Sequence, residues 1–184
     1  MRVRDSIHDD RLPGSYYAAT CKDLSGFKRL EGNIKVDICI VGGGFTGVAA
    51  ALHLAEMGYE VALVEQNRIG WGASGRNGGQ VIGGYGQELS NFAKIEKTFG
   101  AGNADTVWQM GVECVDIISD WVKKYQIDCD LKWGYVDLAM KSGEIEELKH
   151  SKAALEARGY PHEQKVLNAD EVKAYVGSDR YIGG

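Results

Sequence analysis

The sequence is poor in proline and has no long apolar run. Only two of its 184 residues are proline, which excludes a collagen-like chain and a proline-rich linker. No stretch approaches the ~20 apolar residues that span a bilayer. The charged N-terminus also has no apolar segment of the kind found in a secretory signal. We therefore expect no membrane among the partners of this chain.

Clustered metal ligands and basic runs are also missing. None of the four cysteines belongs to a C-x-x-C pair, and the four histidines do not cluster with them. This spacing argues against a metal site, and reduced thiols in the cytoplasm are the simplest interpretation. Acidic residues number 26 against 21 Lys and Arg, a net charge of −5, which argues against nucleic acid as a partner.

Glycine is what the chain has in excess. It accounts for 25 of the 184 residues, roughly twice the usual ~7%. The remaining composition, 44% hydrophobic and 26% charged, is typical of a globular protein and unlike that of a disordered chain. The glycines must therefore meet local backbone requirements, and their positions indicate which.

The first of these positions lies in a predicted βαβ unit. Residues 36–41 form a short run rich in β-branched side chains, which is typical of a buried parallel strand. Residues 45–57 predict a helix that Gly58 ends in a left-handed turn, and residues 60–65 predict a second strand. A strand, a glycine turn, a helix and a strand within about 30 residues predict a βαβ unit.

The turn after the first strand fits the pattern G-x-G-x-x-G. Gly42 permits the tight turn, Gly44 lets the backbone approach a pyrophosphate, and Gly47 lets the helix pack close to the sheet. Phe45 and Thr46 begin the helix, whose free N–H groups favour an anion. Glu65 follows Gly42 by 23 residues, and its carboxylate suits the ribose hydroxyls. This pattern predicts adenine-dinucleotide binding but does not separate NAD from FAD, and a tight turn without a ligand is the alternative.

A second glycine-rich segment follows almost directly, over residues 68–80. A simple NAD-binding unit normally enters its next helix at this point. Arg68, Ser74 and Arg76, with the backbone N–H groups around them, would suit a second phosphate and a flat ring system. The alternative is an exposed glycine loop with surface arginines.

Later elements are predicted from helical and alternating patterns. We expect helices over 86–99, 104–125 and 143–158 and a strand over 131–140. Ser142 is the expected N-cap of the third helix, and Asn168 and Glu171 resemble a capping box for a last helix that reaches Val176. Residues 1–34 are expected to form an extended lead-in. On the helix over 104–125 the expected apolar face carries Val107, Cys114, Ile118, Trp121 and Tyr125, and Trp108, Trp121 and Trp133 are expected in the core.

Three stretches together resemble a known family. Residues 41–47, Val64-Glu65 and the run Gly72–Gln80 are similar to the FAD-dependent oxidoreductases related to D-amino-acid oxidase. Further stretches, at Ser15–Ala19, Lys124–Lys132 and Tyr181–Gly184, resemble the gamma-glutamylputrescine oxidase subfamily. The resemblance covers nearly all of the chain. Proteins of this family are considerably longer, so the chain resembles their N-terminal portion.

The resemblance implies an α/β fold. We expect a lead-in over 1–34, part of an FAD-binding Rossmann-like domain over 35–130, and the start of an α+β substrate domain over 131–184. FAD is expected to be non-covalent, because the second glycine segment has no histidine to which a flavin could be attached. The residues expected along the flavin side are Arg68, Ala73, Ser74, Arg76, Asn77, Gly78, Gly79 and Gln80.

The implied activity is the oxidation of a small amine, with gamma-glutamylputrescine in polyamine catabolism as the expected substrate. The products would be an aldehyde, ammonia and hydrogen peroxide, with dioxygen as the electron acceptor. No catalytic residue and no oligomeric state follow from this part of the sequence. Two alternatives stay open: an NAD-dependent dehydrogenase fragment, and a catalytically inactive nucleotide-binding fragment.

Overall fold

The computed structural model describes residues 14–21, 27–84 and 88–184, and the chain forms two compact units. The first unit extends to Gln80 and the second begins at Val81. Each unit is described by itself below. The domain limits predicted from the sequence refer to the complete protein. The two units describe only how this chain packs, so these limits stay a prediction. No helix in the described ranges is long and apolar enough to cross a membrane.

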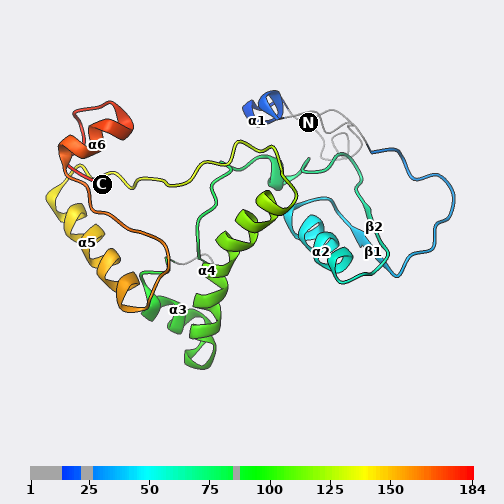
Figure 1. The fold of residues 1–184 in the computed structure, drawn as a ribbon, viewed down its shortest axis with the longest axis horizontal. Coiled ribbons are helices and arrows are strands. Elements are labelled where there is room, and N and C mark those ends of the chain that lie inside the picture. The colour runs from blue at the N-terminus through cyan, green and yellow to red at the C-terminus, as the bar shows by residue number, and fades with distance from the viewer. Residues whose placement is uncertain (1–13, 22–26, 85–87) are drawn as a thin grey trace, which may run out of the picture. The chain divides into compact units, whose positions relative to one another are not determined.

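The first unit is built around the expected βαβ arrangement (Figure 1). Strand β1 covers Ile38–Val41, helix α2 covers Phe45–Glu56, and strand β2 covers Val61–Val64. The two strands pair in parallel, with Ile38 opposite Val61 and Val41 opposite Val64. The predicted strands, helix and parallel connection are therefore confirmed, each to within about two residues at either end, but the burial expected of the first strand is wrong, because no residue of β1 is buried in this chain.

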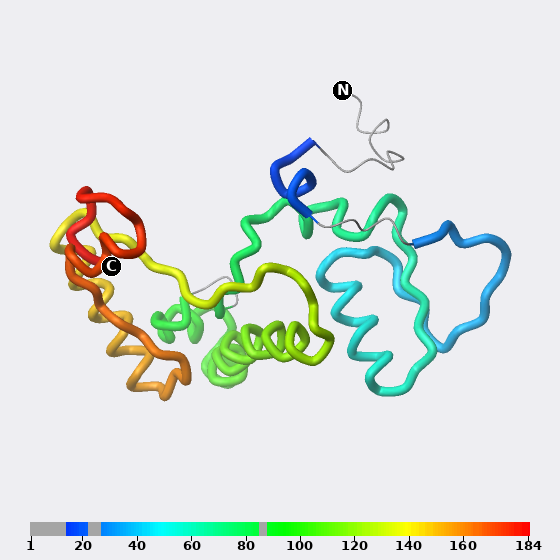
Figure 2. Tube along the Cα trace, turned by 45° about the horizontal axis from the view of Figure 1, so that its top comes forward, coloured from blue at the N-terminus to red at the C-terminus, as the bar shows by residue number. Residues whose placement is uncertain are grey.

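Glycine sets both ends of α2. Gly44 is the N-cap residue, and Gly42 adopts a φ of +107°, which side-chain-bearing residues rarely adopt. At the other end Gly58 has a φ of +91°, so the expected left-handed turn after the helix is confirmed. Figure 2 follows this path from β1 through α2 and back to β2.

The first unit buries very little. Gly43 is its one buried residue among those described, whereas the Val41 side chain is 84% exposed and the Phe45 side chain 67% exposed. A short helix, α1 (Tyr16–Thr20), lies within the predicted lead-in, and the Ser15 side chain caps it. The expectation of an extended lead-in is therefore wrong at these residues.

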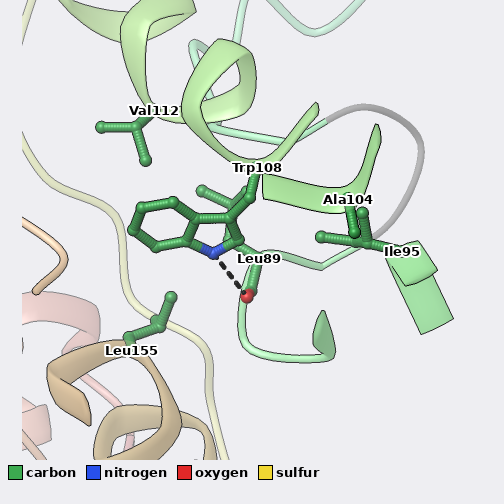
Figure 3. Packing of buried hydrophobic residues seen from close by; sticks show 6 residues of the cluster. All are labelled: Leu89, Ile95, Ala104, Trp108, Val112 and Leu155. Atoms are coloured by element: carbon green, nitrogen blue, oxygen red, sulfur yellow. Dashed lines mark hydrogen bonds between the residues drawn. The ribbon is translucent and has the colours of Figure 1, made fainter. Parts of the chain in front are cut away.

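The second unit has an apolar core, shown in Figure 3. Helix α3 (Phe92–Phe99) and helix α4 (Ala101–Lys124) follow each other in the chain and contact each other. The indole N–H of Trp108 donates to the Leu89 carbonyl at 3.1 Å, so this buried ring has its polar atom satisfied. The core consists of Leu89, Ile95, Ala104, Trp108, Val112 and Leu155.

The predicted apolar face of α4 is wrong in its rotation. The side of the helix that the structure buries carries Trp108, Val112, Val115 and Ser119, and not the expected row that begins at Val107. Burial follows the position of α3 and of the Leu89 segment, which the periodicity of a single helix does not reveal. Trp108 confirms the expectation of a core tryptophan, whereas Trp133 is 62% exposed and contradicts it.

Helix α5 (Ser142–Ala157) and helix α6 (Ala169–Val176) follow. Ser142 is the first residue of α5 and not its cap, because the Glu144 carboxylate accepts the N–H groups that precede the helix. The capping box of α6 is confirmed: the Asn168 side chain accepts from Glu171 N at 3.1 Å, and Glu171 accepts from Asn168 N at 2.8 Å.

The strand expected over 131–140 is wrong. Within that range the structure has an isolated antiparallel bridge between Ala139 and Gly183, and Gly183 also bridges to Asn168. In the described part of the chain no strand pairs with residues 131–138. An alternating pattern without a partner strand therefore stays extended and irregular.

Candidate functional site

The site is centred on the glycine turn between β1 and α2. Gly42 N donates to the Val64 carbonyl at 2.7 Å, which holds the turn against the end of β2. A Cβ at Gly47 would collide with the Gly42 carbonyl oxygen, so the first turn of the helix lies directly on the glycine turn. The reason given for glycine at position 47, close packing of the helix, is consistent with this geometry.

Gly43 joins this turn to the second glycine segment. Its N–H donates to Oε2 of Glu65 at 2.7 Å, and its carbonyl accepts from Gly70 N at 2.9 Å. A Cβ at Gly43 would collide with Cδ1 of Ile69. Both backbone groups and the space for a side chain are thus taken up by the segment that follows β2.

The Glu65 carboxylate is held by hydrogen bonds from the backbone. Oε1 accepts from Asn67 N at 3.0 Å, while Oε2 accepts from Gly43 N. These hydrogen bonds, that from Asn67 most strongly and then that from Gly43, lower the pKa of the Glu65 carboxyl below its ordinary value of 4.5. A third backbone hydrogen bond, from Gln66, acts in the same direction, so of the about four lone-pair sites of a carboxylate at least one is left for a ligand hydroxyl.

The start of helix α2 is open to an anion. Gly44, its N-cap, has no side chain to satisfy the first N–H groups of the helix. Phe45 N donates to Ser74 Oγ at 2.9 Å, and a Cβ at Gly44 would lie 2.9 Å from the same oxygen. The hydroxyl of Ser74 therefore brings the second glycine segment to the N-terminus of the helix. Thr46 and Gly47 complete the first turn there.

The second glycine segment is held partly by its own side chains. A 3₁₀ turn covers Ala73–Gly75, and the Asn77 amide donates to the Ser74 carbonyl at 2.8 Å and accepts from Gly79 N at 2.8 Å. Nε of Arg76 donates to the Trp71 carbonyl at 3.1 Å, with its guanidinium carbon 4.7 Å from the centre of the indole ring. The segment is therefore ordered locally around these two side chains.

The remaining predicted residues lie at the two ends of the second glycine segment. Gly78, Gly79 and Gln80 are exposed at the end of the segment, and Arg68 is half-buried near its start. His53 lies in the last turn of α2, where its Nδ1 is 3.8 Å from a Glu56 carboxylate oxygen. Across the described residues no three His, Cys, Asp or Glu side chains are close enough together to hold a metal ion.

Three residues of this site are not predicted from the sequence. Gly43 is the variable position of G-x-G-x-x-G, so the pattern itself assigns it no role, although a third successive glycine was a usable signal. Asn67 and Gly70 contribute only backbone N–H groups, which no side-chain pattern reveals. Both follow Glu65 closely, so the approach of the two segments could have been expected from the short connection.

The fold and this geometry define a class of protein. A parallel βαβ unit with a glycine turn, an open helix N-terminus and an acidic residue after the second strand is the beginning of a dinucleotide-binding α/β fold. The residues present fit such a group, because Gly44 puts no side-chain cap on the first N–H groups of the helix and Glu65 keeps an acceptor site.

Comparison with known proteins then identifies the family. The model of the FAD dependent oxidoreductase family, DAO, matches residues 37–184. The chain belongs to this family of FAD-dependent oxidoreductases. No solved structure matches the chain significantly.

Several curated relatives have similar sequences. Gamma-glutamylputrescine oxidoreductase of Escherichia coli (strain K12) is 41% identical over 169 residues, which cover 92% of this chain and 39% of that protein. Probable oxidoreductase OrdL of Haemophilus influenzae is 37% identical over 171 residues, covering 92% of the chain and 39% of the relative. Probable oxidoreductase OrdL of Rhizobium meliloti is 32% identical, covering 94% and 40%. The chain thus spans about two fifths of the length of these relatives.

Proposed function

We propose that this chain forms the adenine-dinucleotide portion of an FAD-dependent oxidase of a small amine, with gamma-glutamylputrescine as the substrate. Membership of the FAD-dependent family supports the cofactor, and the 41% identity to a gamma-glutamylputrescine oxidoreductase supports the substrate. The observation that carries the proposal is the closure of the glycine turn onto Glu65, with the Gly43 N–H 2.7 Å from the carboxylate.

The residues divide into two groups by the part of FAD that they would bind. The N–H groups at the start of α2, with Gly42, Gly44, Phe45, Thr46 and Gly47 around them, suit the negative charge of the pyrophosphate. The remaining acceptor capacity of Glu65 suits the ribose hydroxyls, and its negative charge would repel the 2′-phosphate of NADP. The residues assigned to the flavin side are Arg68, Ala73, Ser74, Arg76, Asn77, Gly78, Gly79 and Gln80.

Bound FAD supplies the redox chemistry of such an enzyme by accepting a hydride from the carbon next to the amine. The part that this chain's residues play is to bind and orient. In the complete enzyme the primary amine of the substrate is oxidised to an imine. Water hydrolyses this imine to an aldehyde and ammonia, and dioxygen is reduced to hydrogen peroxide. We assign the activity to the complete protein, because exclusion of water and fixed hydride geometry require a closed site.

Two further features belong to the proposal. FAD is bound without a covalent link, because residues 68–80 contain no histidine. The protein is cytoplasmic and acts in polyamine catabolism, and its four free cysteines are consistent with a reducing compartment.

The test is an assay of hydrogen peroxide with the complete protein after reconstitution with FAD. Gamma-glutamylputrescine should give peroxide and ammonia in equal amounts, at a rate well above that with putrescine. Activity on an amine other than gamma-glutamylputrescine would overturn the substrate while leaving the flavin assignment in place. Reduction of NAD without peroxide would favour the dehydrogenase alternative, and no turnover of any amine would favour the inactive nucleotide-binding fragment.

A further inference from the structure

Glu65 occupies a position between the two glycine segments. Its carboxylate accepts from Gly43 N at 2.7 Å in the first segment and from Asn67 N at 3.0 Å at the approach to the second. Next to this pair of bonds, Gly70 N donates to the Gly43 carbonyl at 2.9 Å. The carboxylate is therefore part of a short network that ties the turn to the segment after β2.

We infer that Glu65 is a positioning residue, whose ionised carboxylate holds the glycine turn in the shape that receives the pyrophosphate. This inference deepens the proposed function and rests on it, since it concerns how the turn receives FAD. The role is separate from acceptance of the ribose hydroxyls. It acts through the backbone of Gly43 and needs no contact between Glu65 and the phosphates.

The physical need for such a residue comes from the glycines themselves. Gly42, Gly43 and Gly44 follow one another, and glycine loses more conformational freedom on ordering than any other residue. Gly43 has no side chain that could restrict its own conformation, so other residues must bind its N–H and carbonyl groups to fix it. Hydrogen bonds to an ionised carboxylate are roughly twice as strong as neutral ones, which suits Glu65 to this task.

The two roles of the carboxylate do not compete. The carboxylate has about four acceptor sites and accepts backbone hydrogen bonds from Gly43, Asn67 and Gln66, so it retains a site for a ribose hydroxyl. A glutamine at this position could accept through one oxygen only, and its NH₂ group would face the other N–H donor. Glu65→Gln therefore breaks at least one of the two bonds while it preserves the size of the side chain.

The experiment separates positioning from ribose binding by the choice of ligand. Binding of ADP and of 2′,3′-dideoxy-ADP is measured by calorimetry for the wild-type chain, Glu65→Gln and Glu60→Gln. Glu60 is an exposed residue just before β2, and its substitution removes the same charge from the same unit. We expect Glu65→Gln to weaken dideoxy-ADP binding about tenfold and Glu60→Gln to leave it unchanged. An equal affinity of wild type and Glu65→Gln for dideoxy-ADP, with a loss for ADP alone, would leave Glu65 as a ribose acceptor only and overturn the inference.

A second readout needs no ligand. Amide hydrogen exchange in the unliganded chain should show protection of the Gly43 and Asn67 N–H groups that falls at least tenfold in Glu65→Gln and not in Glu60→Gln. Unchanged protection would overturn the inference even if nucleotides bind. If wild type binds neither ADP nor FAD, the proposed function fails, whereas the exchange measurement still decides whether Glu65 fixes the turn.

A pH profile of the wild type covers the case in which Glu65→Gln does not fold. Protection factors at Gly43 and dideoxy-ADP affinity should fall together as the Glu65 carboxyl is protonated, below pH 4.5, because its pKa is lowered by the same two bonds. Glu60→Gln should follow the same profile. Protection at Gly43 that persists after protonation of Glu65 would contradict the positioning role.

Discussion

The two units of this chain are stabilised in different ways. In the first unit, residues 14–21 and 27–80 include no buried side chain, and the elements are joined by backbone hydrogen bonds and close approaches at glycine. In the second, helices α3, α4 and α5 contribute side chains to an apolar core around Trp108. A binding turn can thus be held by hydrogen bonds to its backbone without a buried apolar core, whereas a helical unit depends on the side chains that it buries.

The largest expected effect is the loss of the core of the second unit. Trp108→Ala removes a ring that is 2% exposed and leaves the Leu89 carbonyl without its donor. We expect a loss of about 3–5 kcal/mol in the free energy of unfolding of this unit. Trp133→Ala, at a ring that is 62% exposed, is the matched control and should cost less than about 1 kcal/mol. Urea unfolding followed by circular dichroism measures both, and equal losses would contradict the role of Trp108 in the core of this unit.

The second prediction breaks a close approach in the first unit. Gly47→Ala places a methyl group against the Gly42 carbonyl oxygen, so the helix must move away from the turn. Although alanine favours a helix, we expect a net loss of about 1–3 kcal/mol in stability. Gly102→Ala is the control, because no atom lies within 4 Å of a Cβ at that position of α4. It should be neutral or stabilise by up to ~1 kcal/mol, and a stabilising Gly47→Ala would show that the turn and helix do not pack as described.

A smaller effect is expected at the cap of α6. The Asn168 side chain accepts from Asp170 N at 2.9 Å and from Glu171 N at 3.1 Å. Asn168→Ala should cost about 1 kcal/mol by thermal unfolding. Lys165→Ala serves as the control, because its ion pair with Glu163 is exposed and should contribute almost nothing. Equal melting temperatures for the two variants would remove the capping role.

The smallest effect concerns the charge on Glu65. Because its pKa in the folded chain is lowered, its contribution to stability is complete above the ordinary value of 4.5 and is lost as the pH falls through the folded value. The stability difference between wild type and Glu65→Gln, measured by urea unfolding, should therefore shrink as the pH is lowered below 4.5. Water screens this partly exposed carboxylate, so the difference stays small. A stability difference that grows as the pH falls would contradict the stabilising role assigned to the ionised carboxylate.

The features that could be predicted from the sequence are those with a local cause. The βαβ unit is predicted nearly residue by residue, because the strand, the turn and the helix each have a strong local signal in the sequence. Glycine at positions 42 and 58 is such a signal, and both residues have a positive φ in the structure. The capping box at Asn168 was found for the same reason. These features depend on neighbours within a few positions along the chain.

Features that depend on distant partners were predicted less well. The buried face of α4 is set by α3 and Leu89, so the expected row through Val107 was rotated from the true one. Ala139 pairs with Gly183, far along the chain, and the strand expected around it did not form. At the site, Gly43 and Asn67 act through backbone atoms, which residue type does not disclose.

The most direct test of the account is a titration of this chain with FAD and with NAD, in the wild type and in Gly44→Asp. The substitution puts a carboxylate at the N-cap of α2, beside Ser74 Oγ, where the pyrophosphate is expected. We expect saturable binding of FAD in preference to NAD, and at least a tenfold loss of FAD affinity in Gly44→Asp. Tighter binding of NAD than of FAD, or FAD affinity that Gly44→Asp does not change, would contradict it.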